Sequence, residues 1–300
     1  MSQLRAGVFG QVLTAMLTPF DGEGALDLDA AATIARWLQD QGNDGLVVAG
    51  TTGEAPVLSE AEKLDLWRAV SEAVTIPVVA GTGTNNTAET IELTRRAGEC
   101  GAAGVLVVGP YYNRPTQAGI EAHYRAVAAA TDLPVVVYDV PGRTGRRISK
   151  DVLVRLFRDI RNVVAFKDAT GDAPGSAALV AALGDGIDVY SGDDSMTLPL
   201  LACGTVGVIG VATHWATPEF RELFAAWDKG DATGAREVNA RLLASFEFSN
   251  SDTCVFSQSA KAALRVLGLP AGECRLPLGP APEGTEQRAR DVLAALGRDV

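Results

Sequence analysis

The sequence predicts an α/β protein folded as a (β/α)8 barrel, the TIM-barrel architecture, with a three-helix appendage at its C-terminal end. Short apolar stretches of strand type alternate with amphipathic helical stretches, and eight such units follow one another at about 30 residues each. After Lys229-Gly230-Asp231 the pattern becomes purely helical. We therefore predict that residues 1–230 form the barrel and residues 231–300 form the appendage, which is too small to have much of a core of its own.

The predicted strands are mostly continuous apolar runs, as expected of parallel strands that are covered on both faces. They lie at residues 12–17, 45–50, 77–81, 104–109, 134–139, within 162–170, at 189–191 and at 207–213. An open doubly wound sheet also alternates strands with helices. It is not favoured, because the turn Thr18-Pro19-Phe20-Asp21 after the first strand is not a glycine-rich phosphate turn.

The predicted helices have apolar residues at helical spacing, and two of them have recognisable start signals. Asp27 or Asp29 lies near the cap of the first helix, and Ser59-Glu60-Ala61-Glu62 is a capping box at the start of the second. The barrel helices are predicted at residues 28–41, 59–74, 87–100, 116–130, 149–157, 174–183, 196–203 and 217–228, and the appendage helices at 231–248, 256–267 and 283–296.

Composition restricts the classes of function. The 300 residues are 47% hydrophobic and 21% charged, a globular composition, and the net charge of -11 argues against a nucleic-acid partner. No apolar run approaches membrane-spanning length, and there is no signal-peptide pattern. The cysteines are scattered, with Cys100 and Cys203 in apolar, core-like surroundings, and the two histidines are far apart. We predict a cytoplasmic protein with no metal site and no membrane partner.

The sixth predicted strand ends in a lysine. In the stretch 162–170 an apolar run is followed by Lys167 and then by Asp168. A lysine at the end of a buried strand is costly unless the protein uses it, and burial lowers the pKa of its amine. A neutral amine is a nucleophile that can form a Schiff base with a ketone. The alternative is that Lys167 simply extends to solvent.

Other polar groups follow the second and fourth strands, at the barrel end where active sites are built. Gly50-Thr51-Thr52-Gly53-Glu54 follows the second strand, and its hydroxyl and turn N–H groups suit a carboxylate. Tyr111 and Tyr112 follow the fourth strand. The alternatives are an ordinary turn in which Glu54 pairs with a neighbour, and tyrosines that pack at the rim.

The fifth strand ends in Tyr138, and Arg143 follows it. Because side chains alternate along a strand, Tyr138 shares a face with Val136. If that face points inward, Tyr138 lies one strand from Lys167 at nearly the same height. One chemistry then uses all three groups: Lys167 condenses with a keto acid, a tyrosine hydroxyl moves protons, and an arginine holds a second carboxylate.

These groups lie in motifs that occur together in a known family. The motifs are GTTGE at 50–54, PYYNRP at 110–115, YDVPGRTG at 138–145, FKDATGD at 166–172, SGDD at 191–194 and GVIGVATH at 207–214. Over almost its whole length the sequence resembles the dihydrodipicolinate synthase family of pyruvate-dependent Schiff-base lyases. The resemblance implies a (β/α)8 barrel that is usually tetrameric, with the active site in the barrel and no cofactor.

The resemblance also implies a role for individual residues. The Schiff-base lysine is Lys167, and the proton relay runs from Tyr138 through Thr52 to Tyr112. The further residues implied are Thr51 and Thr52 for the pyruvate carboxylate, Arg143 for the carboxylate of the aldehyde, Gly192 and Ile209 for backbone contacts with the ligand, and Tyr111 for insertion across a tight dimer interface.

The favoured reaction is condensation of pyruvate with L-aspartate 4-semialdehyde, the entry step of diaminopimelate and lysine synthesis. A second interpretation keeps the Schiff base but uses a sugar-derived aldehyde, and a third is a non-catalytic ligand-binding barrel. Arg143 favours the first, because a short aldehyde that carries a carboxylate suits a guanidinium better than a sugar does. The presence of Lys167 and Tyr138 disfavours the third.

The sequence departs from the family pattern at three places. Asp139 stands where asparagine is often found, Ala55 replaces a serine, and the segment 249–254 lacks the usual NP-type turn. Lys63 stands where lysine-inhibited relatives have histidine or an acid. The resemblance places Asn85, Glu89 and Tyr111 in that effector site. Because the Lys63 ammonium would repel a lysine ligand there, we expect weak inhibition by lysine or none.

Overall fold

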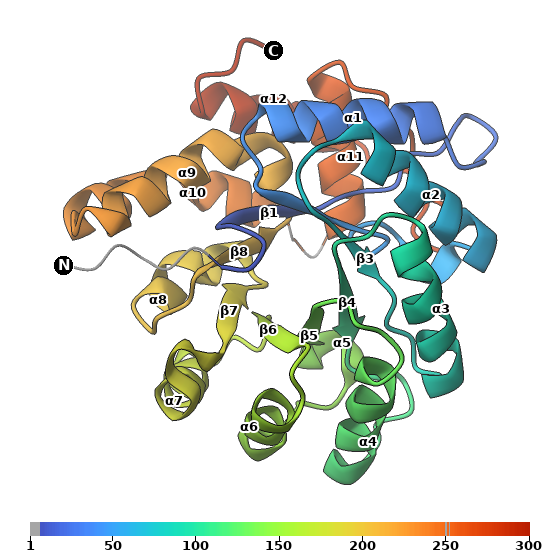
Figure 1. The fold of residues 1–300 in the computed structure, drawn as a ribbon. Helices are drawn as coiled ribbons and strands as arrows, with labels where there is room; N and C mark the ends of the chain where they lie inside the picture. Colours follow the sequence, from blue (N-terminus) through green and yellow to red (C-terminus); the bar gives the residue numbers. More distant parts are fainter. Residues whose placement is uncertain (1–6, 250, 252) are drawn as a thin grey trace.

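The computed structural model describes residues 7–249, 251 and 253–300. Eight parallel strands form a closed barrel in which each strand pairs with its neighbours in sequence and β8 pairs with β1 (Figure 1). This confirms the predicted fold class. The strands are β1 (Val12–Ala15), β2 (Gly45–Val48), β3 (Val78–Gly81), β4 (Gly104–Val108), β5 (Val135–Asp139), β6 (Val163–Asp168), β7 (Asp188–Ser191) and β8 (Gly207–Gly210).

Helices surround the barrel on the outside (Figure 1). Asp27 caps the first of them by accepting the Ala30 N–H, and Ser59 and Glu62 form the predicted capping box at the second. The α-helices of the barrel are α1 (Leu28–Asp40), α2 (Glu60–Ala73), α3 (Thr87–Glu99), α4 (Gln117–Ala128), α5 (Pro141–Thr144), α6 (Lys150–Asp159), α7 (Ala173–Leu183), α8 (Thr197–Leu201) and α9 (Thr213–Asp228). Short 3-10 turns are η1 (Ala55–Val57), η2 (Gly184–Gly186) and η3 (Asp194–Met196).

Three details differ from the sequence prediction. The helix α9 begins at Thr213, four residues before its predicted start. A helical turn at Thr213 is joined to the rest of the helix, which contains Pro218, across a kink at Ala216. The helix predicted at 196–203 is split between η3 and α8. The short helix α5 was not predicted; Pro141 lies in its first turn, where its fixed φ suits a helix start, and Gly145 ends it with a φ of 69°.

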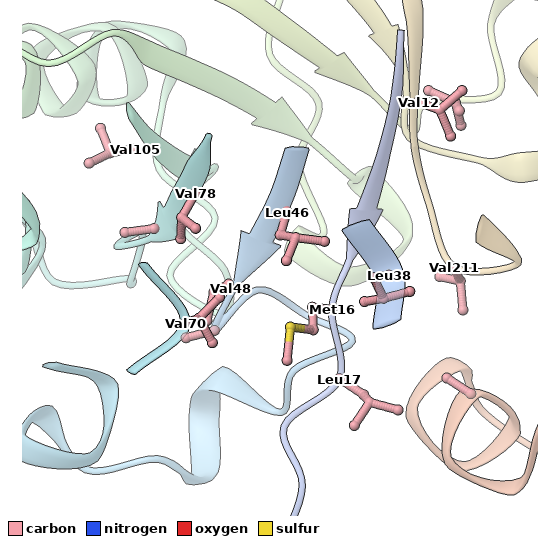
Figure 2. Close-up of a cluster of buried hydrophobic side chains, with 14 of the residues drawn as sticks. Val12, Met16, Leu17, Leu38, Leu46, Val48, Val70, Val78, Val105 and Val211 are labelled. Atoms are coloured by element: carbon pink, nitrogen blue, oxygen red, sulfur yellow. The ribbon is translucent and has the colours of Figure 1, made fainter. Parts of the chain in front are cut away.

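Two apolar layers hold the barrel together. Inside it, side chains from alternate positions of the strands pack on one another, among them Leu13, Val47, Val79, Val136 and Ile209. The neighbouring residues point outward to the helices. Figure 2 shows this outer layer, in which strand residues meet Leu38 of α1 and Val70 of α2, together with side chains just after β1 and β8. The labelled strand residues are Val12, Leu46, Val48, Val78 and Val105.

The residues after 230 form α10 (Ala232–Ser249), α11 (Phe256–Val266) and α12 (Thr285–Ala295). The helix α10 runs beside α9 (Figure 1), and α11 packs against α12 and contacts α9 and α10. The 249–254 segment is only partly described, since Asn250 and Asp252 lie outside the described residues. Of the cysteines predicted to be core residues, Cys100 is buried, whereas Cys203 is partly exposed because it lies at the end of α8.

A buried ion pair ties the appendage to the turn after β2. Glu54 Oε1 accepts from Lys261 Nζ of α11 at 2.7 Å, and both side chains are almost fully buried. The other oxygen, Oε2, accepts the backbone N–H of Arg275 at 2.9 Å. Lys261 also donates to the Glu273 carbonyl and lies 4.3 Å from the centroid of the Phe20 ring. Glu54 therefore does pair, with a residue distant in the sequence.

We predict that Lys261→Met lowers the free energy of unfolding by about 3–5 kcal/mol, because it leaves the Glu54 carboxylate buried without its partner. The double variant Glu54→Gln/Lys261→Met is expected to recover most of that loss. Urea unfolding at one fixed protein concentration measures both effects. Arg68→Met, which breaks the exposed Arg68–Asp65 pair, is the control. A loss no greater than that of the control would contradict the prediction.

Candidate active site

Lys167 and Tyr138 are neighbours across the β5–β6 pair. The two residues are directly opposite in the parallel register, and the Lys167 ammonium lies 4.5 Å from the centroid of the Tyr138 ring. Lys167 comes two positions after Ala165 on β6, and Tyr138 comes two positions after Val136 on β5. Because Ala165 and Val136 point into the barrel and side chains alternate along a strand, Lys167 and Tyr138 point into it as well. Lys167 is only 5% exposed, which excludes the alternative in which it extends to solvent.

Burial adjusts the acidity of both groups. It lowers the pKa of Lys167 to about 8, while the Asp194 carboxylate raises that pKa and Arg143 lowers it. Burial also raises the pKa of Tyr138 to about 12, opposed by Arg143 and by a hydrogen bond with Thr51. A useful fraction of Lys167 is therefore neutral and nucleophilic near neutral pH, and Tyr138 keeps its proton.

Asp194, the last residue of the SGDD motif, also belongs to this site, although the sequence predicted no role for it. Its carboxylate accepts the backbone N–H groups of Val211 and Ala212, just after β8. It is buried, and burial raises its pKa to about 6. Asp194 therefore supplies a negative charge near Lys167 that favours a cationic nitrogen there. The only sequence signal was an acidic pair at the end of a barrel strand.

A cavity of about 490 Å³ opens at the same end of the barrel. Thr51, Tyr111, Tyr112, Tyr138 and Arg143 all line it, so it unites residues from the turns after β2, β4 and β5. Lys167 is not among the lining residues; its nitrogen lies against the ring of Tyr138, which does line the cavity.

The remaining predicted contacts, Thr52, Gly192 and Ile209, do not line the cavity. Ile209 belongs to the inner apolar layer. Gly192 lies against Lys167, and a Cβ at this position would be 2.9 Å from Lys167 Cγ and 3.0 Å from Cε. The chain therefore needs a glycine at position 192 for the lysine to fit.

The threonine that meets Tyr138 differs from the one predicted. The hydrogen bond with Tyr138 comes from Thr51, whereas Thr52 is buried away from the cavity. The two threonines lie in an irregular turn, in which Ala49 and Glu54 both have positive φ angles, of 57° and 56°. This geometry assigns Thr51, in place of Thr52, as the neighbour of Tyr138.

The two tyrosines after β4 have different surroundings. Tyr111 is half-buried in its own chain, where it hydrogen-bonds the backbone of Asn85, and burial and Glu89 raise its pKa. Tyr112 is 90% exposed and has a φ of 67°. Insertion of Tyr111 across an interface stays a prediction, and the exposed Tyr112 is a second candidate for that role.

Arg143 lies on α5, the short helix that follows β5. Its guanidinium is 5.0 Å from the centroid of the Phe256 ring at the start of α11, so the appendage contributes to its placement. The side chain is a positive group at the cavity wall, suited to the carboxylate of a ligand. Across residues 7–249, 251 and 253–300, no group of three or more His, Cys, Asp or Glu side chains has the arrangement of a metal site.

The model of the dihydrodipicolinate synthetase family matches residues 8–296. The chain belongs to this family. It is 50% identical over 299 residues to the 4-hydroxy-tetrahydrodipicolinate synthase of Acidothermus cellulolyticus, and the match covers 99% of this chain and 95% of that protein.

Two solved structures of the dihydrodipicolinate synthetase family match over nearly the whole chain. The first is the Cyanidioschyzon merolae enzyme with lysine bound, with a TM-score of 0.94 and 40% identity, covering 97% of this chain and 99% of that one. The second is described as the first monomeric dihydrodipicolinate synthase variant, with a TM-score of 0.90 and 39% identity, covering 96% of each chain. The family resemblance found in the motifs is confirmed.

If Lys167 forms the predicted adduct with pyruvate, we predict that Asp194→Asn shifts the formation of this adduct to lower pH. The Asp194 charge raises the pKa of Lys167, so its removal leaves more neutral amine at a given pH. An amide oxygen still accepts the N–H groups of Val211 and Ala212. The rate of borohydride-trapped adduct formation between pH 6 and 9 measures the shift.

Asp185→Asn serves as the control, because Asp185 is exposed in η2 and is not among the charges that shift the pKa of Lys167, Tyr138 or Asp194. Its profile is expected to follow that of the unmodified protein. An unmoved profile in Asp194→Asn would show that Asp194 does not set the acidity of Lys167.

Proposed function

We propose that the chain condenses pyruvate with L-aspartate 4-semialdehyde to give 4-hydroxy-tetrahydrodipicolinate, the first committed step of diaminopimelate and lysine synthesis. It is then a lyase of the class I aldolase type. The observation that carries this proposal is the buried Lys167–Tyr138 pair beside a cavity wall that bears Arg143. The names of relatives at 50% identity over nearly the whole chain support the same reaction.

In the proposed mechanism, the neutral Lys167 nitrogen attacks C2 of pyruvate and forms a carbinolamine. Its hydroxyl is protonated and leaves as water, which gives an iminium ion. Loss of a proton from C3 gives an enamine, and C3 then attacks the aldehyde carbon, whose oxygen takes up a proton to become the 4-hydroxyl. The amino group of the product attacks the former C2, closes the ring and releases Lys167. No metal or cofactor is required, since the iminium nitrogen accepts the electrons.

Tyr138 is the proposed proton carrier for these steps. Its hydroxyl stays protonated, since its pKa is about 12, and it is hydrogen-bonded to Thr51. A proton can therefore pass between the carbinolamine and Thr51 without leaving a charged tyrosinate in the barrel. We propose that Tyr112, which is exposed at the cavity, extends this path toward solvent.

We further propose that the protein is a homotetramer, a dimer of dimers, in the cytoplasm. Exposed apolar side chains lie at the cavity mouth, and Tyr112 and Leu278 are lining residues that a second chain would cover. All four cysteines are free, as is usual in a reducing compartment. None of the helices among the described residues combines the length and apolar character needed to cross a membrane.

We predict that pyruvate with borohydride labels Lys167 and no other lysine, because Lys167 is buried beside Tyr138 with a lowered pKa. Mass spectrometry of peptides locates the label. Lys167→Ala is expected to lose the adduct and nearly all turnover, and Lys229→Ala, an exposed lysine just after α9, is the control. Normal turnover in Lys167→Ala would falsify the Schiff-base mechanism.

We predict that Tyr138→Phe and Arg143→Ala affect different steps. Loss of the Tyr138 hydroxyl should lower kcat by about 10²-fold or more, since positioned acid–base groups contribute about 10² to 10⁴. Loss of the Arg143 guanidinium should mainly raise the KM for the aldehyde. Steady-state kinetics with each substrate varied in turn separates the two effects. An effect of Arg143→Ala confined to pyruvate would mean that its role is misassigned.

We predict weak inhibition by lysine or none. Lys63 lines the cavity and is only 7% exposed; burial lowers its pKa, whereas Glu89 and Glu60 raise it. Its ammonium would repel that of a lysine ligand. Assays across millimolar lysine test this expectation, with Lys63→Gln as the comparison that should gain sensitivity. Clear inhibition of the unmodified enzyme below about 1 mM, about -4 kcal/mol of binding, would contradict it.

A further inference from the structure

The loop that bears Arg143 is closed at its base by a single carboxylate. The chain leaves β5 at Asp139, forms α5 and comes back at Ile148. Asp139 Oδ2 accepts the Ile148 N–H at 3.0 Å, so one side chain joins the two ends of the loop. Within the loop, the Thr144 hydroxyl can donate to the carbonyl oxygens of Val140 and Arg146. The loop is therefore a compact unit whose position depends on its base.

Asp139 is close to the reacting groups but on the other side of the strand. It directly follows Tyr138 and is paired in register with Asp168, which directly follows Lys167. Since side chains alternate, the two aspartates point outward toward the helices while Tyr138 and Lys167 point inward. Asp139 therefore lines no part of this cavity. It can act on the reaction through the loop or through its charge, which raises the pKa of Tyr138; the first route changes the KM for the aldehyde and the second changes kcat.

The surroundings of the two aspartates are unequal. Asp168 accepts from the Thr170 N–H and hydroxyl and from the Ser176 hydroxyl. Asp139 is 1% exposed, and its Oδ1 has no hydrogen-bond partner among the described residues. A buried carboxylate with one bare oxygen is costly when charged.

Asp139 also lines a second cavity, of about 450 Å³, on the outer side of β5 and β6. The helices α6 and α7 lie next to each other on this side (Figure 1). Four ionisable groups face Asp139: Asp168 on β6, Arg147 in the loop, Lys150 at the start of α6 and Tyr124 on α4. Arg147 is itself ion-paired with Asp172, which lies just before α7.

We infer that Asp139 is a positioning residue, which holds the Arg143 loop in place through Ile148 and holds it more firmly when its carboxyl group is ionised. The inference rests on the proposed function, because it assumes that Arg143 binds the carboxylate of the aldehyde substrate. Asp139 itself touches neither substrate nor reacting atoms.

The ionisation falls in the physiological range. Burial raises the pKa of Asp139 to about 7, and the neighbouring Asp168 raises it further, while the Ile148 N–H and Arg147 oppose the rise. Below that pH the carboxyl group is neutral and accepts the Ile148 N–H weakly. Above it the hydrogen bond is charge-assisted and roughly twice as strong. The aldehyde should therefore bind more tightly as the pH rises through 7.

Stability should change in the opposite direction. The pKa of Asp139 in the folded protein is higher than that of an unfolded aspartate, so the folded state favours the protonated form. Its ionisation costs stability as the pH rises from about 4 to above 7. Ionisation of Asp139 therefore lowers the free energy of unfolding of the protein while it strengthens the hydrogen bond that holds the loop. A merely structural residue would not produce these two opposite trends.

The test compares the unmodified enzyme with Asp139→Asn, which keeps an acceptor for Ile148 but cannot ionise, between pH 6 and 8.5. At each pH, the KM for the aldehyde is measured in both proteins, and the value for the unmodified enzyme is divided by the value for the variant. This ratio is expected to fall about fivefold between pH 6 and pH 8.5. Asp139→Asn should also raise the urea midpoint at pH 8 more than at pH 5. Asp159→Asn, which removes an exposed carboxylate of α6, should show neither effect.

Asp139→Leu removes the acceptor altogether, and its KM for the aldehyde should exceed that of Asp139→Asn about tenfold at every pH, with trapping by pyruvate and borohydride within about twofold of normal. A ratio that does not change with pH for Asp139→Asn overturns the inference, as does an equal loss of pyruvate trapping in Asp139→Leu. If Asp139→Leu does not fold, the Asp139→Asn comparison alone decides. Absence of a pyruvate adduct in the unmodified enzyme would instead overturn the proposed function.

Discussion

The pairing of β5 with β6 is the constraint around which the site is arranged. It sets Lys167 against the ring of Tyr138, inside a barrel whose interior is lined by apolar side chains. The strand register decides this contact, because a shift of one residue would turn Lys167 outward and Asp168 inward. Arg143 and Asp194 then act on a pair whose position the backbone has already fixed, and they oppose one another in their effect on the pKa of Lys167.

The C-terminal helices complete the site without supplying a reacting group. Lys261 holds the carboxylate of Glu54, which ends the turn that presents Thr51 to Tyr138. Phe256 lies against the guanidinium of Arg143. Two walls of one cavity, from the turns after β2 and β5, are therefore supported by the same helix, α11. The appendage is best described as the outer support of the active site.

Strand periodicity was enough to predict the barrel and the adjacency of Tyr138 and Lys167, because alternation and parallel pairing follow from local pattern. The choice between Thr51 and Thr52 could not be predicted, since both lie in an irregular turn with positive φ angles at Ala49 and Glu54, where the alternation of a strand no longer applies. The role of Asp194 was missed for a similar reason: its charge acts on Lys167 through space, from the turn after the neighbouring strand β7. Likewise, the partner of Glu54 lies 207 residues away, and no local signal marks Lys261.

That separation has a consequence for the order in which a newly made chain matures. The turn after β2 is synthesised early, but the ammonium that neutralises its carboxylate is added 207 residues later. At about 5–20 residues per second, the delay is roughly 10 to 40 seconds. During this interval the Glu54 carboxylate lacks the ammonium with which it pairs in the folded protein. The turn that presents Thr51 can therefore reach its final form only after residue 261 has been made, so competence for the reaction depends on the helix α11 as well as on the barrel.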